Sequence, residues 1–238
     1  MPERWDNAAA LRKEQIESGL DLTFSSVFLP YYLNLVKELR PSSLLEVGCG
    51  TGHLSFELNR RISNVVAVEP SPGMHAVASD ILADTGVQLI NKSVQDCELA
   101  QPFDLIISHM CIQTINNLDG FLEPIRLLMN RKSLFVFTIP HPCFYNDYKA
   151  FFSSSEYSYI VPMKKNITFT VTKDPDRPIS GVPYNHRPLS CYFGCLRMHD
   201  MLVADFHEIF PEPAVQTLYG AGWDTPRYCV FHVKRDPK

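Results

Sequence analysis

The hydrophobic positions along the chain fall into short apolar runs, separated by stretches in which apolar residues recur at helical spacing. The run Phe103–His109 shows no alternation of apolar and polar residues, which is typical of a parallel strand buried on both faces. The apolar runs predict a first strand that starts at Leu44. Further strands are predicted at Val65–Glu69, Val87–Asn91, Phe103–His109, Ser133–Ile139, Val203–Phe210 and Arg227–Arg235.

Spacings of three and four between apolar residues predict helices in the N-terminal forty residues. One pattern covers Asn7–Gly19, and a second contains the apolar residues Phe24, Val27, Phe28, Tyr31, Tyr32, Leu35, Val36 and Leu39. We expect these helices to form a cover, residues 1–40, ahead of a main domain that occupies residues 41–238.

Two further helical patterns contain prolines that restrict where each helix begins. In the first, Pro124 is expected in the first turn, because proline inside a helix removes a hydrogen bond. In the second, Pro188 is expected in the first turn. The buried faces are predicted to contain Phe121, Leu122, Ile125, Leu128 and Met129 in the first helix, and Leu189, Phe193 and Leu196 in the second.

Residues 144–187 form an insertion that is rich in aromatic side chains. The alternation in residues 156–163 and 165–172 suggests strands of a hairpin or lid. A turn is expected at Asp174–Pro178, with Gly181 and Pro183 as further breaks. The insertion therefore predicts a lid inside the main domain.

Composition narrows the class of protein. The 238 residues, 45% hydrophobic and 20% charged, suffice for one large domain with an insertion. The net charge of −4 and the pI near 6.1 give no basic face for nucleic acid. No apolar run approaches the roughly 20 residues that span a bilayer, and no secretory leader is evident, so we expect no membrane partner and a soluble, cytoplasmic protein. The seven scattered cysteines predict reduced, buried thiols.

Histidines and cysteines raise the alternative of a zinc site. The set comprises His141, Cys143, His186, Cys191, Cys195 and His199. The last three are spaced by four residues on a predicted helix and therefore share one face, but no second pair completes a structural zinc site. Shared packing is the better interpretation, and no metal is predicted.

The stretch Leu44–Ser55 joins a strand to a glycine-rich turn and then to a helix. Glycines at positions 48, 50 and 52 allow a ligand to approach the backbone closely, and a helix N-terminus presents unpaired N–H groups. Glu69 ends the next strand 21 residues beyond Gly48, close to the roughly 20-residue offset of a ribose-binding acid. This pattern predicts a nucleotide-binding turn.

These residues resemble the class I S-adenosylmethionine-dependent methyltransferases, whose first strand is followed by E/D-x-G-x-G-x-G. The resemblance implies an α/β, Rossmann-like, doubly wound and mostly parallel seven-stranded sheet with helices on both faces. It implies S-adenosylmethionine as cofactor, with Glu46, Gly48, Gly50 and Gly52 around its methionine part and Glu69 on its ribose. The dehydrogenase fingerprint fits less well, because position 53 is His53 and no third glycine stands in that register.

Further cofactor contacts follow from the same resemblance. Asp96 and Gln95 would lie on the adenine side, although Asp96 could equally be a solvated loop acid. Ser108, His109 and Met110 would line the sulfur end. In the cover, the aromatic residues Trp5, Tyr31 and Tyr32 would contact the cofactor or pack on the sheet edge.

The acceptor side is predicted from the end of the fifth strand and from the insertion. His141 stands between two prolines where the carboxyl end of the sheet should open, and it would act as a base or as a structural histidine bonded to a loop. The stretch Asn185–Ser190 also resembles one found in small-molecule methyltransferases. We place around the acceptor the aromatic residues Tyr145, Tyr157, Tyr159, Tyr184 and His186.

Three functions are compatible with these features. The first is methyl transfer to oxygen, nitrogen or carbon of a small-molecule acceptor, including specialised metabolites, by a monomer or homodimer. The second is a cyclising lyase on the same fold, which would release methylthioadenosine instead of S-adenosylhomocysteine. The third is a non-catalytic binding module. The intact glycines and both acids favour an enzyme, and the aromatic insertion favours the methyltransferase.

Overall fold

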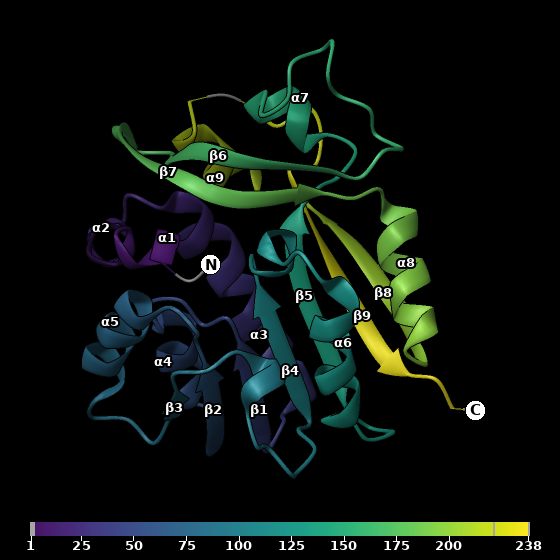
Figure 1. The fold of residues 1–238 in the computed structure, drawn as a ribbon. Coiled ribbons are helices and arrows are strands. Elements are labelled where there is room, and N and C mark those ends of the chain that lie inside the picture. Colours follow the sequence, from purple (N-terminus) through teal and green to yellow (C-terminus); the bar gives the residue numbers. More distant parts are fainter. Residues whose placement is uncertain (1–2, 221, 238) are drawn as a thin grey trace. The chain divides into compact units, whose positions relative to one another are not determined.

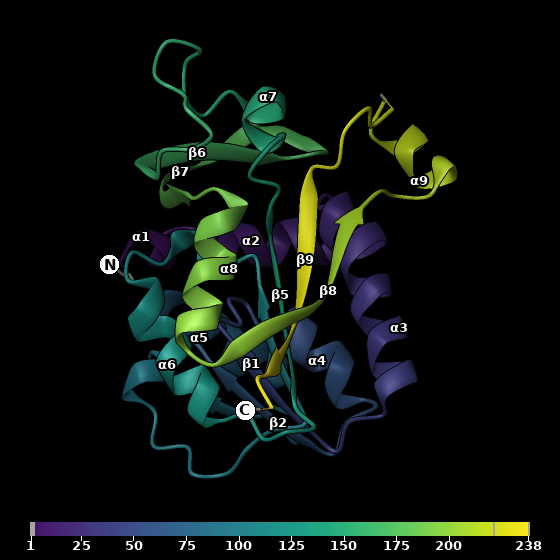
Figure 2. The same ribbon diagram turned by 90° about the vertical axis from the view of Figure 1, so that its right-hand side faces the viewer.

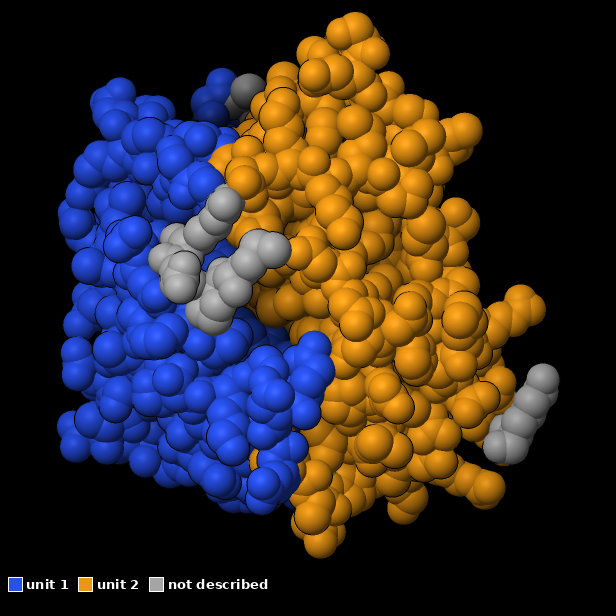
Figure 3. All heavy atoms as spheres, in the orientation of Figure 1, with its two compact units in different colours: residues 1–98, 168–182, 211–222 blue, residues 99–167, 183–210, 223–238 orange. Residues whose placement is uncertain are grey.

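The computed structural model describes residues 3–220 and 222–237. The chain forms two compact units, coloured blue and orange in Figure 3. Unit 1 comprises residues 1–98, 168–182 and 211–222, and unit 2 comprises residues 99–167, 183–210 and 223–238. Each unit therefore combines segments that are far apart in the sequence.

Unit 1 begins with the predicted N-terminal helices. They are α1 (Glu3–Asp6), α2 (Ala9–Glu17), a π-helical turn (Phe24–Phe28) and α3 (Leu29–Leu39). Most of the apolar stripe of the second segment is buried, with Tyr32 and Val36 nearly inaccessible, whereas Tyr31 is partly buried and Leu39 is exposed. Helices α1 and α2 pack on α5 (Pro72–Leu82), and α3 packs on α4 (His53–Asn59).

The sheet part of unit 1 contains three of the predicted strands. β1 (Ser43–Val47), β2 (Asn64–Val68) and β3 (Gln88–Ile90) are parallel neighbours, as Figure 1 shows. Helix α4 connects β1 to β2, and α5 connects β2 to β3. This arrangement places the glycine-rich turn and Glu69 at the carboxyl ends of adjacent strands, since parallel strands end at the same sheet edge.

A two-stranded sheet is formed by β6 (Met163–Val171) and β7 (Asp174–His186), so the insertion contains a hairpin, but only the second of its two expected strands, residues 165–172, belongs to it. The turn expected at Asp174–Pro178 is wrong, because the chain turns at residues 172–173 and this segment is strand. Gly181 and Pro183 also lie inside β7 and do not interrupt it. A two-stranded sheet leaves one edge of each strand unpaired, so prolines without an N–H are tolerated there.

The hairpin tip is bonded to the N-terminal helices within unit 1. The side chain of Gln15, which is fully buried, donates to Asp174 Oδ2 at 2.9 Å, and Lys173 N donates to Leu20 O at 3.2 Å. Arg177 bonds both Asp174 and Glu14. The same unit ends with α9 (Pro213–Leu218).

Unit 2 contains the remaining strands. β4 (Leu105–His109) and β5 (Leu134–Pro140) are parallel, and β9 (Tyr228–Arg235) pairs antiparallel with both β5 and β8 (Met201–Ile209), which are visible in Figure 2. Every residue of β5 is buried. Phe137 and Phe231 stack at 4.5 Å between ring centroids, so aromatic packing joins the two neighbouring strands.

The helices of unit 2 are α6 (Leu118–Leu127), α7 (Tyr145–Lys149) and α8 (Leu189–Met198), with a 3₁₀ turn at Ile112–Thr114. The position expected for Pro124 is wrong. Asn117 caps α6 by accepting the N–H of Gly120 at 3.1 Å, which starts the helix early enough that Pro124 lies in its interior. Leu128 and Met129 are buried but follow the helix end.

Two other expectations for unit 2 are corrected. Residues 156–162 form turns and irregular structure, and β6 begins only at Met163. In α8, Phe193 is 43% exposed, and the buried positions one turn apart are Tyr192 and Leu196. Pro188 immediately precedes α8 as its N-cap residue.

The strand order of the larger sheet is β3-β2-β1-β4-β5-β9-β8, in which the pairs β1–β2, β2–β3 and β4–β5 are parallel and β9 is antiparallel to both β5 and β8. The predicted fold class, an α/β protein with a mostly parallel seven-stranded sheet, is confirmed. All seven cysteines carry free thiols. No helix within residues 3–220 and 222–237 has the length and apolar character needed to cross a membrane.

Candidate active site

The glycine-rich turn after β1 is held by backbone bonds to the next strand. The N–H groups of Gly48 and Cys49 both donate to Val68 O, at 2.9 and 3.2 Å. Gly50 has φ +56°, and a Cβ there would meet no atom within 4 Å, so the backbone is open to an approaching ligand. Gly52 has φ +81° and lies so close to Ala78 that a Cβ would contact it at 3.1 Å. The turn therefore requires glycine for both conformation and space.

Glu69 connects this turn to the start of α5. One carboxylate oxygen accepts the N–H of Gly50 at 2.9 Å, and the other accepts the N–H of Ser71 at 2.8 Å. The residue is only 7% exposed, and burial raises the pKa of its carboxyl. Each oxygen keeps lone pairs for further donors. The predicted ribose acid is thus fixed in position by two backbone groups.

Glu46 lies on β1, two residues before the first glycine of the turn. It accepts a hydrogen bond from the hydroxyl of Ser55 at 2.5 Å and is 2% exposed. Burial raises its pKa to about 7. A buried carboxyl without a cationic partner favours its neutral form, and a nearby ammonium group would favour the carboxylate. This environment fits the predicted contact with the ammonium of an amino-acid moiety.

Asp6, which no sequence pattern had indicated, bonds α1 to the start of α5. Its carboxylate accepts the hydroxyl of Ser71 at 2.5 Å and the N–H of Gly73 at 2.8 Å. A Cβ on Gly73 would meet the Asp6 backbone at 2.6 Å, so the contact also depends on glycine. The N-terminal cover is therefore attached two residues from Glu69.

Other predicted cofactor residues of unit 1 have diverse surroundings. Asp96 and Gln95 are exposed in the 3₁₀ turn after β3, where the Asp96 carboxylate accepts the Ser93 hydroxyl. Tyr31 is partly buried and packs edge-on against Tyr32 at 5.5 Å. Trp5 contacts Phe169 of β6 at 6.4 Å between ring centroids. These contacts leave the adenine assignment and the role of Tyr31 as predictions.

In unit 2, Ser108 and Met110 lie at the carboxyl end of β4. Ser108 is fully buried, and its hydroxyl has no hydrogen-bond partner among the described residues. Met110 has φ +48°, and its N–H donates to Thr138 Oγ1, which also contacts His109 Nδ1 at 2.8 Å. The strand thus ends in a strained residue that bonds to the neighbouring strand.

His141 is a buried member of a pair. Its ring is 1% exposed, Nδ1 accepts the N–H of Cys143 at 3.2 Å, and Nε2 lies 3.0 Å from Glu208 Oε1. Burial lowers the pKa of the imidazole, although Glu208 opposes this effect. Both ring nitrogens are engaged, and the Glu208 side chain, 48% exposed, is the accessible member of the pair.

The five predicted acceptor residues come together in one aromatic cluster of unit 2. Tyr157 and Tyr159 contact His186 at 5.1 and 6.0 Å between ring centroids. Phe151 connects Tyr145 to Tyr184 at 5.7 and 5.3 Å. Phe152 contacts Tyr157, Tyr184 and His186.

Several hydroxyl and ring groups of this cluster bond to the backbone. Tyr157 donates to Pro142 O at 2.9 Å, and His186 Nε2 lies 2.9 Å from Tyr159 O. Burial raises the pKa of Tyr145 well above its usual range, and Tyr228 acts in the same direction. These tyrosines are therefore neutral and fixed in orientation.

Sequence reasoning missed two groups near this cluster. The guanidinium of Arg227 lies 3.8 Å from the Tyr148 ring centroid and 4.2 Å from that of Trp223. Asn185 donates to Gln113 O at 3.0 Å, and Arg187 donates to Ile115 O. The resemblance of residues 185–190 to a segment of small-molecule methyltransferases predicted that this segment lies near the acceptor, but it did not predict the contacts of Asn185 and Arg187.

The parallel sheet, the glycine turn after β1 and the acid after β2 define a Rossmann-like nucleotide-binding class of protein. Residues 44–131 match the family described as "Methyltransferase domain". A malonyl-[acyl-carrier protein] O-methyltransferase of Acetivibrio thermocellus is 34% identical over 92 residues, which are 38% of this chain and 32% of that protein. The chain spans about a third of the length of the first curated relatives it matches.

Solved structures show the same fold at low sequence identity. An S-adenosylmethionine-dependent methyltransferase from Mesorhizobium loti aligns with a TM-score of 0.66 at 18% identity, covering 85% of this chain and 96% of that one. A 1,6-didemethyltoxoflavin-N1-methyltransferase from Burkholderia thailandensis aligns with a TM-score of 0.58 at 16% identity, covering 99% and 91%. Residues 44–131 therefore match a methyltransferase domain, and the chain shares its fold with S-adenosylmethionine-dependent methyltransferases of known structure.

Replacing Glu46 by Gln tests the electrostatics of the turn. Because the folded-state pKa of Glu46 is raised from 4.5 to about 7, ionisation destabilises the folded protein as the pH rises through that interval. E46Q should therefore increase the free energy of unfolding above pH 7 by on the order of 1–3 kcal/mol. Denaturant titrations at several pH values would measure this gain, which should shrink toward pH 4.5. A gain that does not vary with pH would contradict the assignment.

Proposed function

We propose that this protein transfers a methyl group from S-adenosylmethionine to an oxygen, nitrogen or carbon atom of a small-molecule acceptor. The observation that carries the proposal is the arrangement of Glu46, Glu69 and the glycine turn in unit 1. Two buried carboxyls lie at the ends of adjacent strands, one with a raised pKa and one oriented by two N–H groups. A nucleoside with a cationic amino-acid tail is complementary to both.

The cofactor, when bound, supplies an electrophilic methyl group, and the chain's own residues bind and orient it. Glu69 would accept hydrogen bonds from ribose hydroxyls, and Glu46 would pair with the ammonium group. On the adenine side, Gln95 would donate or accept hydrogen bonds, and the Asp96 carboxylate would accept them. Ser108, Met110 and Tyr31 are proposed as further contacts, on the basis of the family resemblance.

The aromatic cluster of unit 2 supports a small organic acceptor. The partly exposed rings of Phe151, Tyr157 and Tyr159 offer apolar surface, whereas Phe152, Tyr145 and Tyr184 are buried, and aromatic faces attract cations. Three buried polar atoms, Gln113 Oε1, Asn185 Oδ1 and Arg187 Nη1, find no hydrogen-bond partner within the described residues. A polar group of the acceptor would satisfy them, so we expect an acceptor with both an apolar body and a hydrogen-bonding group.

Proton removal from the acceptor is assigned to the pair His141 and Glu208. Since Nδ1 of His141 accepts a backbone N–H, Nε2 carries the proton and donates it to Glu208. His141 would then hold the carboxylate in position to take up the proton of the acceptor. In this assignment Glu208 is the base, and His141, which the sequence left open as a base or a structural residue, positions it.

The relatives differ in their acceptors, so the fold leaves the acceptor open. The Acetivibrio protein is named for malonyl-[acyl-carrier protein], and the Burkholderia structure contains 1,6-didemethyltoxoflavin. We favour a free small molecule because the stretch Asn185–Ser190 resembles one found in small-molecule methyltransferases and because the insertion before it is rich in aromatic side chains. A cytoplasmic location and a monomer or homodimer complete the proposal.

Replacing Glu69 by Ala should weaken S-adenosylmethionine binding by roughly 100-fold or more, since two hydrogen bonds to a charged group are lost at about 1.5–3 kcal/mol each. Isothermal titration calorimetry would measure this loss. Glu57→Ala removes a surface acid that pairs with Arg60 and serves as the control. Unchanged affinity in a folded Glu69→Ala protein would refute the ribose assignment.

Replacing Glu208 by Gln should reduce turnover by about 10²-fold or more, the lower range for a positioned acid or base, with little change in cofactor affinity. His141→Ala should behave similarly, and Glu123→Gln, an exposed acid of α6, should leave both quantities unchanged. Single-turnover kinetics with an identified acceptor would separate the two effects. Full turnover in both Glu208→Gln and His141→Ala would remove the pair from the mechanism.

A further inference from the structure

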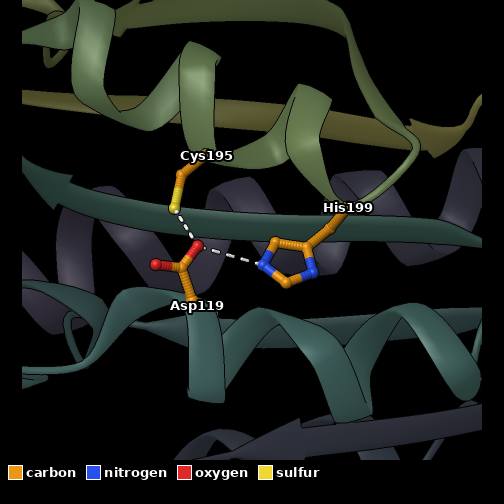
Figure 4. A group of neighbouring side chains, drawn as sticks. All are labelled: Asp119, Cys195 and His199. Carbon is orange, nitrogen blue, oxygen red and sulfur yellow. Dashed lines mark hydrogen bonds and ion pairs between the residues drawn. The ribbon is translucent and has the colours of Figure 1, made fainter.

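Three potential metal ligands from two helices of unit 2 converge on one point. Asp119 lies in the first turn of α6, Cys195 lies on α8, and His199 follows the end of α8 by one residue. Asp119 Oδ1 is 3.0 Å from Cys195 Sγ and 3.1 Å from His199 Nε2, as Figure 4 shows. All three ligand atoms lie within 4.8 Å of one another. A single carboxylate oxygen thus contacts both of the other ligands.

The spacing of the helix residues explains this convergence. Cys195 and His199 are four residues apart, so both side chains leave the same side of α8. That side faces α6, which packs against α8. Cys191, one turn earlier, is not part of the group. The expectation that Cys191, Cys195 and His199 merely share packing did not include the acid from the other helix.

The two distances from Asp119 require little change for coordination, and Cys195 Sγ and His199 Nε2 lie within 4.8 Å of each other. Zinc bonds of about 2.0–2.3 Å to oxygen, nitrogen and sulfur place tetrahedral ligands roughly 3.4–3.6 Å apart. The observed contacts of 3.0 and 3.1 Å would need to widen by only a few tenths of an ångström. Asp119 has a side chain that is 59% exposed, so water can reach a fourth position.

We propose that Asp119, Cys195 and His199 bind a zinc ion, with water as the fourth ligand. The thiolate and the carboxylate would neutralise both charges of the ion, and the imidazole would coordinate through Nε2. Cysteine sulfur and histidine nitrogen are ligands that zinc prefers, whereas magnesium and calcium prefer oxygen. The ion would connect α6 to α8, and this proposal is independent of the methyltransferase reaction.

Binding must release a proton from the thiol. A coordinating thiol is deprotonated, so one proton leaves for each ion bound.

A second group with potential ligands, Asp205, His207 and His232, lies on β8 and β9 and has a weaker case. His207 Nε2 lies 3.2 Å from Asp205 Oδ2, but the imidazole rings of His207 and His232 pack edge-on against each other, at 4.8 Å between centroids. It contains no thiol, which gives the two groups distinguishable spectra. A cobalt ion bound at Cys195 would show a sulfur-to-metal charge-transfer band that the histidine group cannot produce.

The test uses the full chain, stripped with a chelator and then titrated with Co²⁺ and with Zn²⁺. We expect one Co²⁺ per chain with a charge-transfer band, displacement of Co²⁺ by Zn²⁺, and release of about one proton in calorimetry. Cys195→Ser should abolish the band. His199→Ala and Asp119→Asn should each weaken binding by more than the roughly 10–100-fold typical of changes outside the ligand sphere.

Matched variants make the outcome decisive. Cys191→Ser removes another thiol of α8 and should leave the band and the affinity unchanged, as should His207→Ala. Thermal unfolding of each variant without metal verifies that it is folded. Absence of a charge-transfer band in the wild-type protein, or its persistence in Cys195→Ser, would overturn the proposal.

Discussion

The geometry of unit 1 depends on the carboxylate of Glu69. One of its oxygens holds the glycine turn through Gly50, and the other holds the start of α5 through Ser71. The backbone of Glu69 bonds to β3, because its N–H donates to Ile90 O and its carbonyl accepts the side chain of Asn91. Three strand ends and one helix are thereby fixed around a single buried acid, and the cover joins them through Asp6.

The turn bonded to Glu69 must be made of glycine. Gly50, whose N–H donates to Glu69, and Gly52 both have a left-handed backbone conformation that other residues rarely adopt. A side chain at Gly52 would meet Ala78, and one at Gly50 would occupy space that is open to a ligand. Burial of Glu46 and Glu69 raises the pKa of both, which disfavours the charged forms in the free protein. A cationic, hydroxyl-bearing ligand would relieve that cost, so recognition and electrostatics point to the same class of ligand.

Much of this unit could be predicted from the sequence because its signals are local. The glycine spacing, the apolar runs and the acid after β2 lie within short segments, and the structure places them as expected. Asp6 was missed because its partners are 65 and 67 residues away and no periodicity connects them. Asp119 was missed for the same reason, since Cys195 is 76 residues distant.

The errors of the sequence reading also have physical causes. Prolines in residues 174–183 suggested a turn, but the unpaired edges of a two-stranded hairpin accept them. Pro124 suggested a helix start, but the cap at Asn117 lies earlier in the chain. For His141 the sequence left a base and a structural residue open, and its pairing with Glu208 could not be predicted because the two are 67 residues apart.

The proposed transfer of the methyl group of S-adenosylmethionine to a small molecule can be tested directly. Purified protein would be incubated with cofactor carrying a deuterated methyl group, alone and with a protein-free extract of small molecules, and analysed by mass spectrometry. We expect S-adenosylhomocysteine only with extract, together with a labelled small molecule. Release of methylthioadenosine without any acceptor, or the absence of a labelled small molecule with extract, would contradict methyl transfer to a small molecule.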